Sequence, residues 1–159
     1  MEKKERNTIL SLFLATVLLR FSGLYSVNPY INIDEAAIGY SSWCLGNYGT
    51  DRYCNSFPIY IENFYGGQSP AYAYLLIPIV KIFGLNLMSV RSLSAICYCI
   101  TFWSFYYLIK DKDKTFRFFA MLLYTISPVM IWFGRIALDC NLMMPFLINA
   151  CACLKKAMK

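Results

Sequence analysis

Four charged side chains could carry chemistry in this sequence, and the chain contains no histidine to share the task. Asp34 and Glu35 are adjacent, and a carboxylate can act as a general base, which must accept a proton at the working pH. Arg91 and Arg135 are permanently charged and can form paired hydrogen bonds to a phosphate or a carboxylate. Together these types suit a reaction in which a carboxylate removes a proton while cations hold an anionic group.

Each of these residues also has an ordinary structural explanation. Two acids in the first turn of a helix can simply cap it and compensate its dipole. Arginines beside apolar sequence can extend toward lipid headgroups, and so can Lys81. Arg135 and Asp139 lie four residues apart, so on a continuous helix they would share a face and could form an ion pair. Lys81 could also join the two arginines at an anionic site.

The composition indicates which elements must position these residues. The chain is 58% hydrophobic, 18% aromatic and 15% charged, whereas soluble domains carry about 25% charged and 45–50% apolar residues. Too few polar side chains are present to cover a water-facing globule. This excludes a soluble enzyme, a disordered regulator and a small secreted disulfide scaffold, and it argues against a nucleic-acid partner. The sequence therefore predicts an all-α, polytopic integral membrane protein.

Transmembrane helices need about 20 apolar residues to cross a hydrocarbon core of about 30 Å. Four segments meet this need, approximately 8–27, 90–109, 118–134 and 136–154. Arg20 lies near the far end of the first segment, where it can extend to the headgroups. No signal-peptide cleavage site follows that segment, so we expect an uncleaved helix. A fifth segment, 70–83, contains two prolines and Lys81 and is only about 21 Å long as a helix, too short to span readily.

The distribution of positive charge decides how segment 70–83 is placed. If this segment stays at the interface, ten basic residues lie on one side of the membrane and five on the other; if it spans, the division is six and nine. Cytoplasmic loops are enriched in Lys and Arg. The first arrangement is therefore favoured, with four spans, both termini cytoplasmic, and one membrane domain over 1–159 whose residues 28–89 are external. The ten cytoplasmic residues are then Lys3, Lys4, Arg6, Lys110, Lys112, Lys114, Arg117, Lys155, Lys156 and Lys159.

The external segment 28–89 predicts two interfacial helices. Asn32 followed by Glu35 three residues later matches a capping box, so the first helix should run from there to about Tyr48. Ser69 and Pro70 are typical of the start of the second helix. An aromatic, amphipathic first helix would lie flat on the membrane surface. Its predicted apolar face carries Ala36, Tyr40, Trp43 and Cys44.

The seven cysteines do not form a disulfide framework or a metal pattern. Cys44 and Cys54 are both external, so a disulfide between them is one option in an oxidising compartment. The other cysteines fall in the predicted spans as small apolar residues, and their spacing is not that of a zinc site. They are Cys97, Cys99, Cys140, Cys151 and Cys153. No cofactor is required by the sequence; if a divalent metal is used, Asp34 and Glu35 are its candidate ligands.

Four pieces of the chain, in this order and with this topology, resemble the N-terminal part of a GT-C membrane glycosyltransferase. The similar branch contains protein O-mannosyltransferases, bacterial aminoarabinose transferases and related polyprenyl-phosphate-sugar enzymes. The pieces are the acidic pair within 33–36, the Tyr-rich segment 69–76, the helix start at 90–95, and the Ser-Pro, Arg and Asp pattern of 127–139.

The resemblance implies roles for particular residues. Asp34 corresponds to the catalytic base, with Glu35 beside it as a support or metal ligand. Arg91 and Arg135, joined by Lys81, would hold the phosphate of the lipid-linked donor. The substrate loop would include Gln68, Tyr72 and Asp139. The family often has His-Pro-Pro or a lysine where this chain reads Gln68-Ser69-Pro70, so the resemblance does not supply a phosphate or metal contact there.

The expected function is sugar transfer from a polyprenyl-phosphate donor to a hydroxyl of a lipid, glycan or protein at the outer face of a bacterial plasma membrane. A single base and a single attack predict inversion at the anomeric carbon. Since such enzymes have more spans than this chain, we expect the N-terminal part of a larger module, and whether this part is active alone stays open. The rival hypotheses are a non-catalytic four-helix subunit, an inactive truncated remnant, and a small transporter. The last is disfavoured because the span centres, 97–105 and 122–129, carry no charge.

Overall fold

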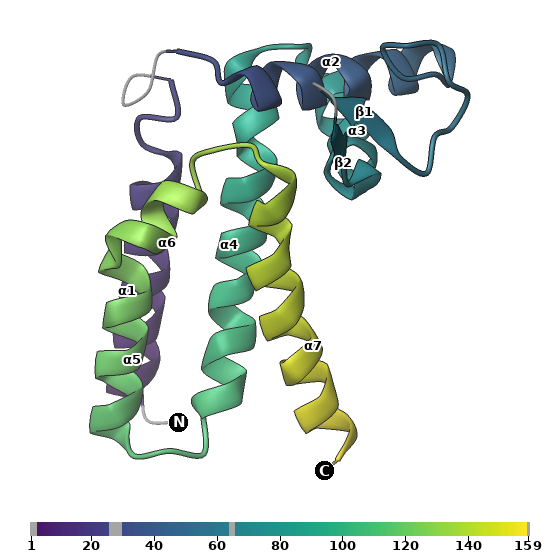
Figure 1. Cartoon of the computed structure of the whole chain (residues 1–159). Coiled ribbons are helices and arrows are strands. Elements are labelled where there is room, and N and C mark those ends of the chain that lie inside the picture. The colour runs from purple at the N-terminus through teal and green to yellow at the C-terminus, as the bar shows by residue number, and fades with distance from the viewer. Residues whose placement is uncertain (1–2, 26–29, 64–65, 159) are drawn as a thin grey trace.

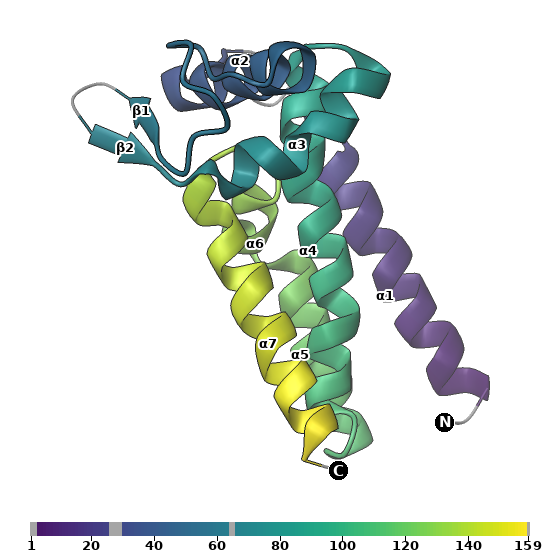
Figure 2. The same cartoon turned by 90° about the vertical axis from the view of Figure 1, so that its right-hand side faces the viewer.

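The computed structural model describes residues 3–25, 30–63 and 66–158. Helices α1, α4, α5 and α7 run side by side as an elongated bundle, and α2, α3 and a small hairpin cover one end of it (Figures 1 and 2). Both ends of the chain lie at the opposite end of the bundle. In the described ranges the elements are α1 (Lys3–Phe21), α2 (Ile33–Tyr48), β1 (Ile61–Asn63), β2 (Gly66–Gln68), α3 (Pro70–Phe83), α4 (Leu87–Ile109), α5 (Lys114–Ile126), α6 (Pro128–Phe133), the 3₁₀ turn η1 (Asp139–Leu142) and α7 (Met143–Ala157).

The two helices predicted for the external segment are confirmed, and α2 begins with the predicted capping box. The Asn32 side chain accepts the Asp34 N–H at 3.3 Å, and the Glu35 carboxylate accepts the Asn32 N–H at 3.1 Å. The helix ends at Gly49, whose φ of 71° is the left-handed conformation that glycine adopts at little cost. Figure 1 shows α2 lying across the end of the bundle, as expected of a helix parallel to the membrane surface.

Only part of the predicted apolar face of α2 packs inward: Cys44 is buried and Trp43 packs partly against the core. Tyr40 is exposed and stacks on Trp43 with ring centroids 6.0 Å apart. The core beneath α2 also receives Ile38 and Leu45, which pack with α3 and the start of α4. Gly39 permits this close approach, because a Cβ there would lie 2.8 Å from Val90 on α4. The Tyr40 ring therefore lies on the outer surface of α2.

A short antiparallel hairpin corrects the all-α expectation. Strands β1 and β2 pair Ile61 with Gln68 and Asn63 with Gly66. Because side chains alternate along a strand, Asn63 and Gln68 lie on the same face as the buried Ile61. Gly67 is required on the other face, since a Cβ there would lie 1.8 Å from the Tyr60 ring. Three-residue strands with two glycines have no alternating hydrophobic pattern, so periodicity does not reveal them.

The four predicted spans correspond to helices with different bounds. The first begins earlier, at Lys3, and its helix ends at Phe21; the predicted end at residue 27 lies outside the described residues. The third is broken at Ser127, because Pro128 cannot donate a backbone hydrogen bond and starts α6 instead. Residues 134–138 are not helical, and α7 begins only at Met143. Among the described helices, only α4 is by itself long and apolar enough to cross a bilayer.

Arg20 does not extend to the headgroups. Its side chain is fully buried in the bundle, where one terminal nitrogen donates to the Tyr124 carbonyl at 3.2 Å. The guanidinium lies over the Tyr124 ring, 5.0 Å from its centroid, which is a favourable cation–π distance. Gly134 leaves room for the arginine stem, because a Cβ there would lie 3.3 Å from the Arg20 Cγ. Arg20 therefore joins α1 to α5 rather than to the lipid surface.

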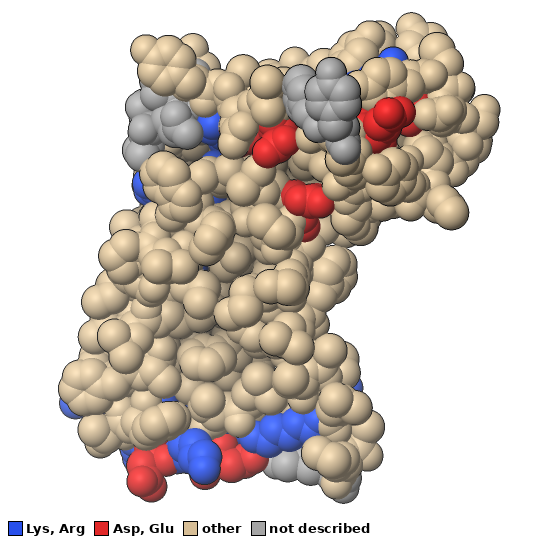
Figure 3. Space-filling view, in the orientation of Figure 1, with Lys and Arg blue, Asp and Glu red and all other residues tan. Residues whose placement is uncertain are grey.

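Charged side chains are grouped at the two ends of the molecule. The face drawn in Figure 3 shows both acidic and basic residues at the lower end and at the upper end, and a broad uncharged band between them. Exposed large apolar side chains of α1, α5 and α7 include Leu14, Leu18, Phe119, Leu123, Phe146 and Leu147. Such a band fits the hydrocarbon core of a membrane.

Candidate active site

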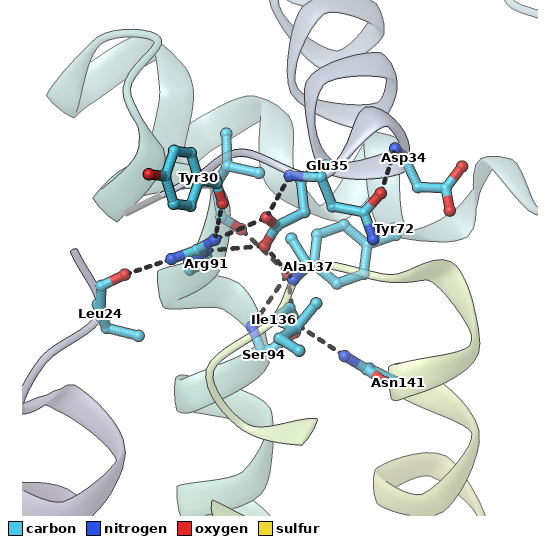
Figure 4. A network of polar contacts seen from close by, with 12 residues as sticks. Leu24, Tyr30, Asp34, Glu35, Tyr72, Arg91, Ser94, Ile136, Ala137 and Asn141 are labelled. Atoms are coloured by element: carbon cyan, nitrogen blue, oxygen red, sulfur yellow. Dashed lines mark hydrogen bonds and ion pairs between the residues drawn. The ribbon is translucent and has the colours of Figure 1, made fainter. Parts of the chain in front are cut away.

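The two adjacent acids of the sequence point to different places. Glu35 faces the interior and is 0% exposed in its side chain, whereas the half-buried Asp34 faces the hairpin. Figure 4 shows the Asp34 carboxylate directed away from the Glu35 network. Consecutive residues of a helix are about 100° apart, so one capping sequence supplies both a buried and an accessible carboxylate.

Glu35 forms a buried ion pair with Arg91 of α4. The two residues are joined by contacts of 2.8 Å to Oε1 and 2.7 Å to Oε2, and the Arg91 side chain is 1% exposed. Glu35 Oε1 also accepts the Ala137 N–H at 2.9 Å. With the Asn32 contact of the capping box, both carboxylate oxygens are occupied. This carboxylate holds α2, α4 and the 134–138 segment together.

Arg91 carries the same network toward α1. Its terminal nitrogens donate to the Leu24 carbonyl at 2.6 Å and to the Tyr30 carbonyl at 3.1 Å. These carbonyls follow α1 and precede α2, so one guanidinium fixes both sides of the connection between the bundle and its cap (Figure 4). Arg91 thus contacts backbone and Glu35 rather than an open cavity.

The pKa of Glu35 is lower than its ordinary value. Burial alone would raise it, but the hydrogen bonds from Arg91, Ala137 and Asn32 stabilise the carboxylate more. Glu35 is therefore ionised at neutral pH and acts as a fixed anion.

Asp34 is held by the hairpin through one oxygen. Its Oδ1 accepts the Asn63 amide at 2.9 Å and the Gln68 amide at 3.4 Å. Arg52 orients Asn63 by donating to its amide oxygen at 2.8 Å. No described residue donates a hydrogen bond to Asp34 Oδ2, so this oxygen is available to accept a proton. The Gln68 Oε1 atom is buried and has no hydrogen-bond partner in the described ranges.

Asp139 brings the η1 turn to the same place. Its Oδ2 accepts the Ser69 N–H at 3.0 Å, and its Oδ1 accepts the Cys140 N–H at 2.8 Å. Ser69 has the predicted N-cap position of α3 but forms no side-chain cap, and Asp139 binds its N–H. The pKa of the Cys140 thiol is raised, first by partial burial and then by the nearby carboxylates of Asp139 and Asp34. Asp34, Gln68 and Asp139 thus surround one polar site, which we call the Asp34 site.

Tyr72 lies beneath this site and is fully buried, not on the substrate surface. Its hydroxyl donates to the Val90 carbonyl at 3.0 Å and contacts the Ser94 hydroxyl at 2.9 Å. Burial raises the pKa of this phenol. Ser94 donates in turn to the Ile136 carbonyl at 2.8 Å. The Tyr72 hydroxyl therefore supports the floor of the site by joining α3 to α4.

Arg135 and Lys81 lie apart from Asp34. Arg135 donates through Nε to the Leu19 carbonyl at 3.0 Å and so caps the end of α1. It does not pair with Asp139, because the two are separated by a non-helical segment and each bonds to a different element. Lys81 packs near Gly46, twelve residues or about 18 Å along α2 from Asp34. The spacing of residues in the sequence does not show that Arg135 and Lys81 lie away from the Asp34 site.

Asp34 and Glu35 do not form a metal-binding pair. They point apart, and both oxygens of Glu35 already accept hydrogen bonds. In the described ranges, no group of three His, Cys, Asp or Glu side chains is arranged to hold a metal ion. The described residues therefore do not fit a divalent cation at this pair. Cys44 is a buried free thiol and Cys54 an exposed one, so no bond joins them in the structure.

Three residues near Asp34 were not predicted from the sequence. Asn63 and Arg52 reach it only through the hairpin, and they lack any sequence motif. Cys140 was placed inside a span, but it is exposed on the η1 turn. Pro128 and Gly134, which interrupt the apolar segment, are the signals that could have indicated a turn there.

Comparison with known proteins decides the family. Residues 67–159, more than half of the chain, match the family model described as dolichyl-phosphate-mannose-protein mannosyltransferase. The chain belongs to this mannosyltransferase family. Its members are membrane glycosyltransferases that use polyprenyl-phosphate sugar donors, as the sequence resemblance implies. Neither the curated proteins nor the solved structures contain a match to the chain.

The matched part of this mannosyltransferase chain contains most of the candidate residues. Gln68 and Asp139 of the Asp34 site lie inside it, as do the three predicted phosphate-binding cations, Lys81, Arg91 and Arg135. Asp34 and Glu35 lie outside it, so their assignment depends on the geometry described above.

Proposed function

We propose that the chain transfers a sugar from a polyprenyl-phosphate donor to an acceptor hydroxyl at the external face of the membrane, with Asp34 as the general base. The observation that supports this most is the environment of Asp34. One oxygen accepts hydrogen bonds from the amides of Asn63 and Gln68, and no described residue donates a hydrogen bond to the other. A general base must be positioned in this way to take a proton from a bound hydroxyl.

The proposed step needs one base and one anionic leaving group. The acceptor O–H gives its proton to Asp34 Oδ2, and the acceptor oxygen forms a bond to the anomeric carbon. The bond between that carbon and the phosphate oxygen breaks, and the electron pair leaves on the polyprenyl phosphate. Because a phosphate is a stable anion, it requires cations rather than a proton donor. A single displacement inverts the configuration of the anomeric carbon.

The three predicted phosphate-binding residues, Arg91, Arg135 and Lys81, have different surroundings. Arg91 is neutralised by Glu35 and buried, which supports a positioning role for it. Arg135 and Lys81 have no carboxylate partner among the described residues. We propose Arg135 as the phosphate-binding residue, because its segment also carries Asp139; binding then requires its guanidinium to leave the Leu19 carbonyl. Lys81, about 18 Å along α2 from Asp34, is too far from the base to hold a phosphate that leaves beside it.

The proposed topology has four spans, formed by α1, α4, the α5–α6 pair and α7. The lower end of the bundle carries the beginnings of α1 and α5, the end of α7 and the connection between α4 and α5 (Figure 1). The described ones among the predicted cytoplasmic basic residues belong to these segments. The α2, hairpin and α3 layer at the other end is then external. We propose that the protein is bacterial and that the membrane it spans is the plasma membrane.

Use of a lipid-linked donor gives the test of this function. We expect the purified protein in liposomes to pass labelled mannose from polyprenyl-phosphate-mannose to an acceptor hydroxyl, and not from GDP-mannose, because the proposed leaving group is a lipid-linked phosphate. The linkage in the product should be inverted relative to the donor, as nuclear magnetic resonance can determine. Transfer from GDP-mannose alone, or a retained configuration, would contradict the mechanism. Absence of transfer from either donor would favour the non-catalytic subunit or inactive remnant.

A further inference from the structure

Arg52 is a cation of the layer that covers the end of the bundle, in the turn between α2 and β1. In the described part of the chain it forms no ion pair with a carboxylate. Its terminal nitrogen Nη2 instead donates to the Glu62 carbonyl and to the Asn63 amide oxygen, both at 2.8 Å. The guanidinium also lies over the Tyr53 ring, 4.9 Å from its centroid, which is a cation–π distance. Arg52 thus joins its own turn to the hairpin that contacts Asp34.

The turn that carries Arg52 is fixed by the residue before it. Asp51 is only 2% exposed. Its Oδ1 accepts the Tyr53 N–H at 2.8 Å and the Asn55 N–H at 2.9 Å. Its Oδ2 accepts the Asn55 side-chain amide at 3.1 Å. A carboxylate with three such bonds holds the backbone in one conformation, so the Arg52 side chain starts from a defined position.

The bonds of Arg52 determine which way the Asn63 amide faces. An amide side chain has an acceptor oxygen and a donor nitrogen, whereas a guanidinium can only donate. The Asn63 oxygen accepts from Arg52, and its nitrogen donates to Asp34 Oδ1 at 2.9 Å. If the amide were turned over, two donors would meet at Arg52 and two acceptors would meet at Asp34. Both contacts would be unfavourable, so Arg52 selects the orientation in which Asn63 donates to Asp34.

We infer that Arg52 is a positioning residue for sugar transfer, which acts on Asp34 through the Asn63 amide. The inference rests on the proposed function, in which Asp34 Oδ2 takes the proton. Without Arg52 the amide can turn, and Asp34 Oδ1 keeps only the longer bond from Gln68, at 3.4 Å. The carboxylate can then adopt orientations in which Oδ2 does not meet the acceptor hydroxyl. A displacement of a catalytic group by about 1 Å can reduce a rate by about 10²-fold.

Replacement of Arg52 tests this role in the purified protein in liposomes, with polyprenyl-phosphate-mannose as donor. Arg52→Met removes the donors, so kcat should fall by about tenfold to a hundredfold while the KM for the donor changes little. Arg52→Lys retains a group that only donates, so it should recover most of the lost rate. Tyr53→Leu is the control, because it removes the ring contact of Arg52 and leaves its hydrogen bonds to the hairpin. Its rate should stay within about twofold of the original, and circular dichroism should show that all three variants are folded.

A double variant separates action through Asn63 from a general role in holding the hairpin. Asn63→Ala removes the amide but leaves the bond from Arg52 to the Glu62 carbonyl. If Arg52 acts through Asn63, adding Arg52→Met to Asn63→Ala should lower kcat little further.

Two kinds of failure can be told apart in this experiment. Losses that multiply in the double variant, an equal loss in Tyr53→Leu, no recovery by Arg52→Lys, or an unchanged rate in Arg52→Met would each overturn the inference alone. Absence of transfer by the original protein would overturn the proposed function, and the inference with it, before any variant is compared.

Discussion

Replacing Asp34 with Asn is expected to reduce mannose transfer by about 10²- to 10⁴-fold, the usual contribution of a general base. The amide oxygen can still accept the Asn63 and Gln68 hydrogen bonds that now reach Asp34 Oδ1. The fold should therefore be kept while the proton acceptor is lost. The measurement is the rate of transfer from polyprenyl-phosphate-mannose at saturating donor, with thermal unfolding measured in parallel.

Glu62→Gln is the matched control for this substitution. Glu62 is an exposed carboxylate on the same hairpin, one residue from Asn63. Its removal changes the local charge by the same amount but leaves Asp34 in place, so transfer should continue at nearly the original rate. Normal transfer by the Asp34→Asn protein would exclude Asp34 as the base.

The largest effect on stability is expected at the Glu35–Arg91 pair. Arg91→Met leaves the Glu35 carboxylate buried without its cation, and breaking a buried ion pair in this way costs about 3–5 kcal/mol. That is a large part of the total stability of an ordinary domain, about 5–15 kcal/mol. The double variant Glu35→Leu, Arg91→Met removes both charges and should lose less than the sum of the two single variants. Unfolding in denaturant followed by circular dichroism measures these differences.

Asp111→Asn gives a control for the ion-pair effect. Asp111 pairs with Lys155 at 3.0 Å, but both side chains are partly exposed, so this pair should contribute only about 0–1 kcal/mol. An Arg91→Met effect no larger than that of Asp111→Asn would show that the buried pair does not hold the cap to the bundle.

The same pair predicts a loss of stability in acid. The pKa of Glu35 is lowered from its ordinary value of 4.5 by folding. Its contribution is therefore fully present above about 4.5 and is lost as the pH falls through the lower folded value. The Glu35→Gln variant lacks this titration and should show a smaller acid-dependent fall in unfolding temperature than the original protein.

The external helices could be predicted because their signals are local. Asn32 with Glu35, and Ser69 with Pro70, specify helix starts through contacts within one turn, and the structure has both helices within the predicted ranges. The break at Ser127 was not predicted, because the flanking residues are apolar enough to read as one continuous span. The hairpin was missed because its strands are three residues long and have no hydrophobic alternation.

The candidate site was only partly accessible to sequence reasoning. The side chains of two adjacent acids on a helix point in different directions. Which of them is buried, here Glu35, and which stays accessible, here Asp34, depends on how α2 packs on α4. Arg91 has the residue type of a phosphate ligand, yet its place opposite Glu35 makes it a partner within the protein. Such pairings join residues far apart in the chain, and spacing carries no information about them.

The central claim is that the Asp34 site and the basic end of the bundle lie on opposite sides of the membrane, with Asp34 external. It is tested most directly by labelling intact cells with a membrane-impermeant maleimide. One variant would retain only Cys54, which is exposed near the hairpin; the other would carry Lys112→Cys as its sole cysteine, in the connection between α4 and α5. We predict that Cys54 is labelled in intact cells and that the Lys112→Cys variant is labelled only after permeabilisation. Labelling of the Lys112→Cys variant from outside, with Cys54 protected, would contradict the account.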